Sequence, residues 1–195
     1  MATASDAPAA GSDARPEEGR REEALDQAFE LFLRFGYRKT SMDEIARAAG
    51  VSRQGLYLWF ASKEVLFREM VARLTERTRA EIDRALAEEQ VPVPERIVAA
   101  FDAYTGVHLE RGMNARAIDE LMEASRRLIG NVIEDLEADL CAKLATLLEP
   151  YADDETSAAQ LAEMLYSVSV GSKYRADSRS DYCQRIRRAA ARICR

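Results

Sequence analysis

The run of residues 42–60, MDEIARAAGVSRQGLYLWF, limits the fold of this chain more than any other feature. Its apolar residues are spaced for two short helices that cross around a tight turn. Ile45 and Leu56 would point inward, and Ala46 is small where the two helices approach each other. Gly50 can adopt the positive φ that such a turn needs. We therefore predict a helix-turn-helix in this segment.

Three serines mark helix starts in and around this motif. Ser41 is followed three residues later by Glu44, the capping-box pattern in which hydroxyl and carboxylate satisfy free backbone N–H groups. Ser52 and Ser62 are placed to cap the two helices that follow. Upstream, apolar residues repeat with helical spacing between residues 20 and 36. These signals predict three helices and the start of a fourth.

The remainder of the chain also has a helical composition. Ala, Leu, Glu and Arg recur, while five Pro and nine Gly are few for 195 residues, of which 47% are hydrophobic. We predict an all-α fold in three parts. Residues 1–19 form a disordered tail, residues 20–66 a three-helix domain with the helix-turn-helix, and residues 67–195 a C-terminal helical domain.

The charge is distributed unevenly along the sequence. The net charge is −6, yet residues 20–75 hold ten basic and eight acidic side chains and form the only basic segment. An acidic protein is a poor non-specific coat for DNA. A small basic surface formed by this segment is still compatible with specific binding to DNA.

The polar outer face of the predicted second helix of the motif suits DNA contact. Its N-terminal end, Ser52 to Gln54, is the end that reads base edges when such a helix enters a major groove. Arg53 could donate to guanine O6 and N7, and Gln54 could pair with adenine. Neighbouring hydroxyl, phenol, indole and ammonium groups suit the phosphate backbone. The predicted contact residues are Thr40, Ser41, Ser52, Arg53, Gln54, Gly55, Tyr57, Leu58, Trp59 and Lys63.

A plain helical hairpin is the alternative interpretation of this segment. In that case Tyr57 and Trp59 would only fill a core, as we expect of Phe60. Arg53 and Lys63 would be no more than solvated charges. The clustering of the polar groups at one end of one helix favours DNA contact.

Three runs make a family resemblance specific: GYRKTSMDEIA at 36–46, AGVS at 49–52, and LYLWF followed by SKEVLF at 56–67. This stretch resembles the tetracycline-repressor (TetR) family, whose usual pattern is T-x-x-x-I-A-x-x-A-G-V-S-x-x-x-L-Y-x-Y-F-x-x-K-E-x-L. The resemblance covers about residues 20–70. Trp59 replaces the Tyr that the family most often has at that place.

The resemblance implies an all-helical homodimer, usually a repressor of transcription. It implies a double-stranded DNA operator as partner and a small-molecule effector in the C-terminal domain. It also implies that the last two helices of each subunit form a four-helix dimer interface. The sequence of the C-terminal part does not identify the effector.

The last two predicted helices have apolar faces with small residues that suit close packing between subunits. Packing within one subunit is the alternative. There is also a physical reason to expect a homodimer. Two DNA-contacting helices that lie one DNA turn apart can bind both halves of a palindromic site. The predicted interface residues are Leu161, Leu165, Val168, Ser172, Tyr182, Ile186, Ala189 and Ile193.

An effector pocket should be mostly apolar with a few polar groups. Seven residues on the middle and later helices are candidates by type, and ordinary core filling is the alternative for each. They are Phe101, Tyr104, His108, Met113, Met122, Met164 and Tyr166.

Enzyme chemistry is not predicted. His108 is the only histidine and lacks a local motif, so neither a metal site nor a catalytic triad is indicated, and we expect no cofactor. The three cysteines lack metal-ligand spacing and are expected to be reduced, although Cys141 or Cys183 could sense oxidants if exposed.

With no signal peptide or apolar span in the sequence, we expect a cytoplasmic protein that does not bind a membrane. A helical adaptor that binds only protein remains a further alternative.

Overall fold

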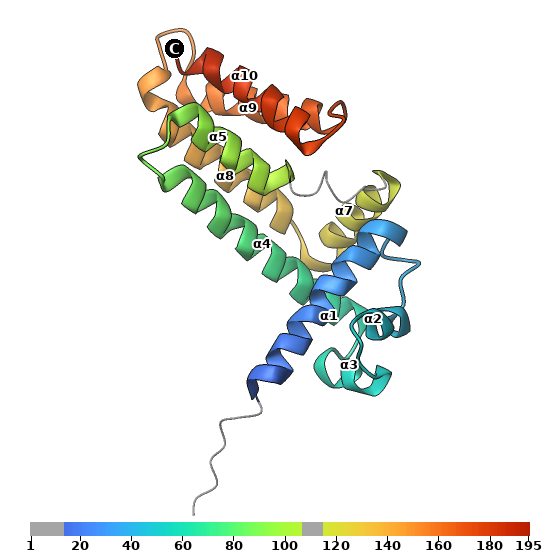
Figure 1. The fold of residues 1–195 in the computed structure, drawn as a ribbon. Coiled ribbons are helices and arrows are strands. Elements are labelled where there is room, and N and C mark those ends of the chain that lie inside the picture. The colour runs from blue at the N-terminus through green and yellow to red at the C-terminus, as the bar shows by residue number, and fades with distance from the viewer. Residues whose placement is uncertain (1–13, 107–114) are drawn as a thin grey trace, which may run out of the picture.

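A computed structural model describes residues 14–106 and 115–195, and every regular element in those ranges is helical (Figure 1). The all-α fold class is confirmed. The elements are α1 (Ala14–Phe35), α2 (Met42–Ala48), α3 (Arg53–Trp59), α4 (Lys63–Ala87), α5 (Val93–Phe101), the π-helix η1 (Asp102–Gly106), α7 (Ala115–Ile129), α8 (Val132–Leu148), the 3₁₀-helix η2 (Glu149–Tyr151), α9 (Ala158–Lys173) and α10 (Arg179–Ile193).

The helix starts predicted from serines are confirmed. Ser41 and Glu44 form a complete capping box: Ser41 Oγ accepts from the Glu44 N–H at 3.3 Å, and Glu44 Oε2 accepts from the Ser41 N–H at 2.8 Å. Ser52 caps α3 and Ser62 caps α4 in the same way, each accepting from a backbone N–H in the first turn. Gly50 turns the chain between α2 and α3 with a φ of 67°.

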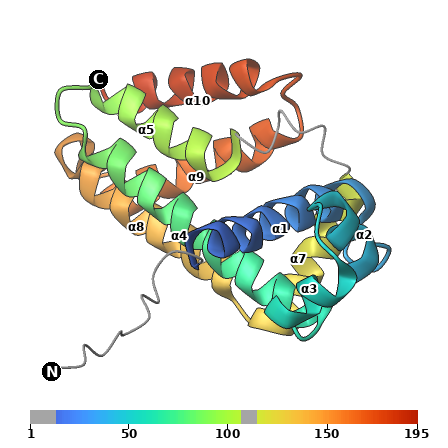
Figure 2. The ribbon, with the colours of Figure 1, turned by 60° about the horizontal axis from the view of Figure 1, so that its bottom comes forward.

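Two hydrophobic cores are joined by α4, which runs between them (Figure 2). The first half of α4 contributes to the core that includes residues of α1, α2 and α3, and its second half contributes to the core that includes residues of α5, α8, α9 and α10. Met70 and Val71 belong to the N-terminal core, so that core continues past the predicted boundary at residue 66. Ala124 of α7 belongs to it as well.

The first helix begins earlier than predicted. It includes residues 14–19, which were assigned to the disordered tail, while residues 1–13 lie outside the described part of the chain. Glu17 in the first turn suits the positive end of the helix dipole. Its carboxylate also accepts a hydrogen bond from Trp59 at 3.2 Å, a contact between distant residues that no local pattern indicates.

Candidate DNA-binding surface and ligand cavity

The crossing of α2 and α3 is fixed by buried side chains and backbone hydrogen bonds. Ile45 and Leu56 are fully buried, as predicted. The Val51 N–H donates to the Ala46 carbonyl at 2.9 Å, which closes the turn. With its inner face held this way, α3 presents its other face outward.

The exposed face of α3 gathers most of the residues predicted to contact DNA. Ser52, Arg53 and Gln54 are exposed at its N-terminal end. Tyr57 is 40% exposed, and Leu58 is 81% exposed. Ser41 is also exposed, while Gly55 and Trp59 are partly covered. The geometry therefore leaves one polar and aromatic helix face open to a partner.

Arg53 is held at the edge of this face. Its guanidinium donates to Asp43 Oδ2 on α2 at 3.0 Å and lies 5.6 Å from the centre of the Tyr57 ring. Both members of the ion pair are largely exposed. The contacts limit the positions of Arg53 without burying its charge.

Thr40 and Lys63 are occupied within the protein. Thr40 is buried, and its hydroxyl donates to the Gly36 carbonyl at 2.9 Å. Lys63 Nζ donates to the carbonyls of Tyr37 and Thr40, both at 2.9 Å, and lies 4.5 Å from the centre of the Tyr37 ring. These two side chains hold the loop before α2. The predicted DNA contact of the buried Thr40 side chain is therefore corrected, whereas that of the partly exposed Lys63 stays a prediction.

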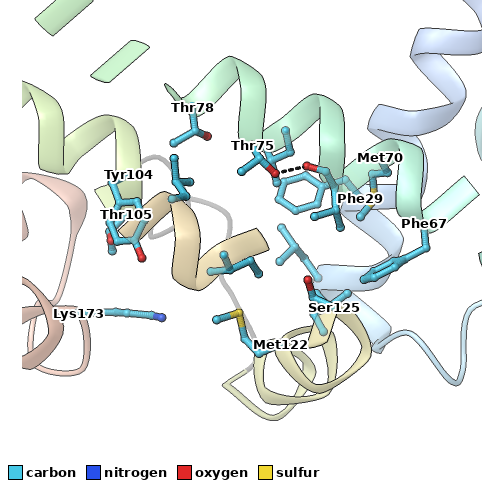
Figure 3. A pocket seen from close by; sticks show the side chains of 16 residues that line it. Phe29, Phe67, Met70, Thr75, Thr78, Tyr104, Thr105, Met122, Ser125 and Lys173 are labelled. Atoms are coloured by element: carbon cyan, nitrogen blue, oxygen red, sulfur yellow. Dashed lines mark hydrogen bonds between the residues drawn. The ribbon is translucent and has the colours of Figure 1, made fainter. Parts of the chain in front are cut away.

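A cavity of about 180 Å³ lies between the two cores (Figure 3). Its wall is largely apolar, with hydroxyl groups and one lysine. The lining residues are Phe29 and Leu33 of α1; Phe67, Met70, Val71, Leu74, Thr75 and Thr78 of α4; Tyr104 and Thr105 of η1; Leu121, Met122 and Ser125 of α7; Ile133 and Leu136 of α8; and Lys173 of α9.

The structure brings only part of the predicted pocket set to this cavity. Tyr104 and Met122 line it, and the Tyr166 ring packs 6.3 Å from that of Tyr104. Phe101 is fully buried in the C-terminal core, and Met164 is 53% exposed. For these two residues the pocket prediction was wrong, because helical spacing does not show which neighbour covers a side chain. His108 and Met113 lie outside the described residues.

Helix α7 connects the cavity with the loop before α2. Leu121, Met122 and Ser125 face the cavity. On the same helix, the Glu120 carboxylate accepts a hydrogen bond from the backbone N–H of Arg38, a residue of that loop. One helix therefore touches both the cavity and the segment that carries the DNA-reading helices. Glu120 and Arg38 are 82 residues apart, so no local sequence pattern indicates this contact.

Five of the eight predicted interface residues of α9 and α10 are buried inside the subunit, and the assignment is corrected for them. Val168, Ala189 and Ile193 are only partly covered, so their place in an interface stays a prediction. Leu161, Leu165, Tyr182 and Ile186 are in the C-terminal core, Val168, Ala189 and Ile193 pack against it, and Ser172 is buried. They stabilise the subunit. The outward side of α9 instead presents Met164, Val170 and Tyr174, which are 53%, 41% and 73% exposed.

A charged cluster links η1 to α10. Arg179 donates to both oxygens of Asp102 at 2.7 Å, and this hydrogen bonding holds the pKa of the Asp102 carboxyl below its usual value. The Cys183 thiol donates to Asp102 Oδ1 at 3.3 Å. Burial, followed by this hydrogen bond, raises the pKa of Cys183 to about 11. A thiol with such a pKa is a weak nucleophile at neutral pH.

The described residues contain neither a cluster of metal ligands nor a membrane-spanning helix. Within residues 14–106 and 115–195, no three His, Cys, Asp or Glu side chains are grouped as they would be around a metal ion. In the same part of the chain, no helix is both long and apolar enough to span a membrane.

Residues 24–70 match the model of bacterial regulatory proteins of the tetR family. The chain is 26% identical over 130 residues to YhgD of Bacillus subtilis (strain 168), an uncharacterized HTH-type transcriptional regulator, and the match covers 67% of this chain and 68% of that protein. It is 35% identical over 103 residues to the HTH-type transcriptional repressor ComR of Escherichia coli (strain K12), a match that covers 53% of this chain and 49% of ComR.

A solved structure extends the likeness in fold to the C-terminal domain. The TetR transcriptional regulator from Legionella pneumophila superposes with a TM-score of 0.67 at 22% identity, over 94% of this chain and 98% of that one. The helix-turn-helix motif, the exposed face of α3 and the named relatives all indicate a DNA-binding regulator. Residues 24–70 therefore match the tetR family of bacterial regulatory proteins, and the helix-turn-helix in this segment is formed by α2 and α3.

Proposed function

We propose that this regulator binds a palindromic operator as a homodimer and represses transcription until a small molecule enters the cavity and releases the DNA. The observation that carries the proposal is the position of α7. Its side chains line the cavity, and its Glu120 binds the loop before α2. A ligand that moves α7 can thereby move the loop that leads into α2 and α3.

The exposed face of α3 is proposed to enter the major groove. Arg53 and Gln54 would read base edges, because long side chains at the N-terminal end of such a helix reach furthest into the groove. Ser41, Tyr57 and Trp59 would contact the phosphate backbone. Lys63 would support DNA binding by holding the loop at Tyr37 and Thr40.

The outward side of α9 is proposed to contribute to the dimer interface. Met164, Val170 and Tyr174 are large and exposed there, and Ser167 and Gly171 lie between them on the same face. Small residues next to large ones allow helices to approach closely. Light scattering should give the mass of a dimer at micromolar concentration, and a monomer would contradict this part of the proposal.

Release requires that the effector bind one conformation more tightly than the other. We propose that the effector displaces α7 and, through Glu120, the loop at Arg38. The two reading helices of the dimer would then no longer match the two half-sites. The ratio of operator affinities without and with effector measures this coupling.

The proposal is tested with DNA fragments from beside the protein's own gene, by fluorescence anisotropy at several salt concentrations. One fragment should bind more tightly than random DNA, and the affinity should fall steeply with salt. An Arg53→Ala, Tyr57→Ala double variant should lose this specificity, whereas Arg84→Ala, an exposed arginine on the distal part of α4, should keep it.

Two results would contradict the proposal. If no fragment binds better than random DNA, operator recognition fails. If the double variant folds normally and keeps full affinity, the α3 face is a surface for another protein, as in an adaptor. Transcription from the bound fragment, measured with and without the protein, then separates repression from activation.

A further inference from the structure

The cavity combines an apolar wall with one charged group. Of its lining residues, all of which belong to the described part of the chain, Lys173 alone is charged, and it is the last residue of α9. Figure 3 shows its side chain extending from α9 toward the cavity, past Tyr104 and Thr105. A cation beside an apolar wall is poorly solvated unless it is paired.

Lys173 has no acidic partner among the described residues. No carboxylate in residues 17–106 or 120–195 lies within ion-pair distance of its Nζ, which is 5.7 Å from the centre of the Tyr174 ring. By contrast, Lys143 and Lys63 are both bound to oxygen atoms of the protein. The C-terminal end of α9 favours a positive charge, and the half-buried Lys173 ammonium still has donors available for an anionic ligand.

Ser125 is a second unsatisfied polar group in the same wall. It is 2% exposed, and its hydroxyl has no hydrogen-bond partner among the described residues. The neighbouring Thr75 hydroxyl, in contrast, donates to the Val71 carbonyl. A buried hydroxyl without a partner costs stability. Ser125 lies on the far side of Met122 from Lys173 in Figure 3, so the two polar groups are separated along the cavity.

We propose that the effector is an amphipathic carboxylate. Its carboxylate pairs with Lys173, its apolar body lies against α1, α4 and α7, and a hydrogen-bonding group at its other end meets Ser125. The inference names the ligand class of the effector site and so rests on the proposed function. The volume of about 180 Å³ suits a small molecule, since an apolar cavity of about 150 Å³ accepts benzene.

Calorimetric titration of the full-length protein without DNA tests the ligand class directly. The probes are octanoate, 1-octanol and octylamine, which share one apolar chain and differ in head-group charge. Octanoate should bind roughly tenfold more tightly than octanol, as expected for a charge-assisted hydrogen bond, and octylamine should bind most weakly. Equal affinities, or a preference for octylamine, would overturn the proposal.

Variants at Lys173 assign the charge preference to this residue. Lys173→Met should abolish the difference between octanoate and octanol, and Lys173→Arg should keep it, with melting curves showing that both variants fold. An unchanged preference in a folded Lys173→Met protein would overturn the role of Lys173. If that variant does not fold, the comparison of the three probes on the wild-type protein still decides the ligand class.

The role of Ser125 is tested with 8-hydroxyoctanoate. This probe should bind more tightly than octanoate to the wild-type protein and equally tightly to Ser125→Ala. No gain in the wild-type protein would overturn the contact to Ser125.

Operator release is measured separately, so that the two proposals fail in different ways. If octanoate binds through Lys173 but leaves the operator complex intact, the ligand class stands and effector-driven release fails. If a neutral or cationic compound releases the operator while octanoate does not bind, release stands and the ligand class fails.

Discussion

Arg53 at the start of α3 donates to Asp43 of α2 across a distance of 3.0 Å, which links the two helices of the DNA-binding motif. Because both side chains are largely exposed, this pair contributes less than about 1 kcal/mol to folding. Its effect is to hold the guanidinium on the outer face of α3, beside Tyr57. The pair thus positions the Arg53 side chain more than it stabilises the fold.

Replacement of Arg53 should therefore change recognition and leave folding almost intact. We expect Arg53→Ala to weaken operator binding by about 1–3 kcal/mol and to relax discrimination at one base position. Asp43→Ala should relax discrimination with little loss of total affinity. Anisotropy titrations with single-base operator variants measure both effects. An equal loss on operator and random DNA would instead identify Arg53 as a phosphate contact.

Lys63 should be needed for stability. Its ammonium joins α4 to two carbonyls of the loop before α2, and hydrogen bonds to a charged group contribute about 1.5–3 kcal/mol. Lys63→Met should lower the free energy of unfolding in urea by about 2 kcal/mol. Lys39→Met, which removes the same charge from an exposed position in the same loop, is the matched control and should change stability little. Equal stabilities of the two variants would contradict this role.

Glu120 should be required for the response to effector. Glu120→Ala removes the acceptor of the Arg38 N–H and frees the loop from α7, so the ratio of operator affinities without and with effector should shrink toward one. Glu123→Ala is the comparison, because it removes only an exposed 3.7 Å ion pair with the Arg38 guanidinium and should lower the ratio much less than Glu120→Ala. If both variants respond like the wild type, the signal passes by another route, such as α4.

The features that the sequence predicted are local in the chain. The Ser41 capping box, the caps at Ser52 and Ser62 and the turn at Gly50 each depend on residues within about four positions. Helix caps and turns follow from backbone geometry that such short segments determine. The motif and the exposed face of α3 could therefore be predicted from one sequence.

The features that the sequence did not predict depend on which helices pack together. Leu165 and Ile186 show the same apolar spacing whether a second subunit or their own core covers them, and the structure places them in the core. Lys173 and Ser125 are 48 residues apart and meet one cavity only because α9 and α7 both border it. Helical periodicity identifies a buried face without identifying its partner.

The Asp102–Arg179 pair should stabilise the fold in a pH-dependent way. Because the pKa of folded Asp102 is lowered from its ordinary value of 3.8, the stabilisation is present above about pH 4 and is lost as the pH falls through the folded pKa. Asp102→Asn should cost about 2 kcal/mol at pH 7 and less at pH 3, below the ordinary pKa of the carboxyl. Glu95→Gln breaks the more exposed pair with Arg187 and should cost under about 1 kcal/mol. Urea unfolding at both pH values compares the variants, and a pH-independent cost for Asp102→Asn would contradict the assignment.

Cys183 should be an unreactive thiol. Burial, followed by the hydrogen bond to Asp102, raises its pKa from 9.0 to about 11, so its thiolate fraction at pH 8 should be roughly 100-fold lower than that of an ordinary cysteine. Alkylation by iodoacetamide, followed by mass spectrometry, should be correspondingly slow at pH 8 and should accelerate up to about pH 11. The same residue in urea provides the control, because unfolding removes both causes of the shift. Rapid alkylation of the folded protein at pH 8 would contradict this expectation and would restore Cys183 as a candidate oxidant sensor.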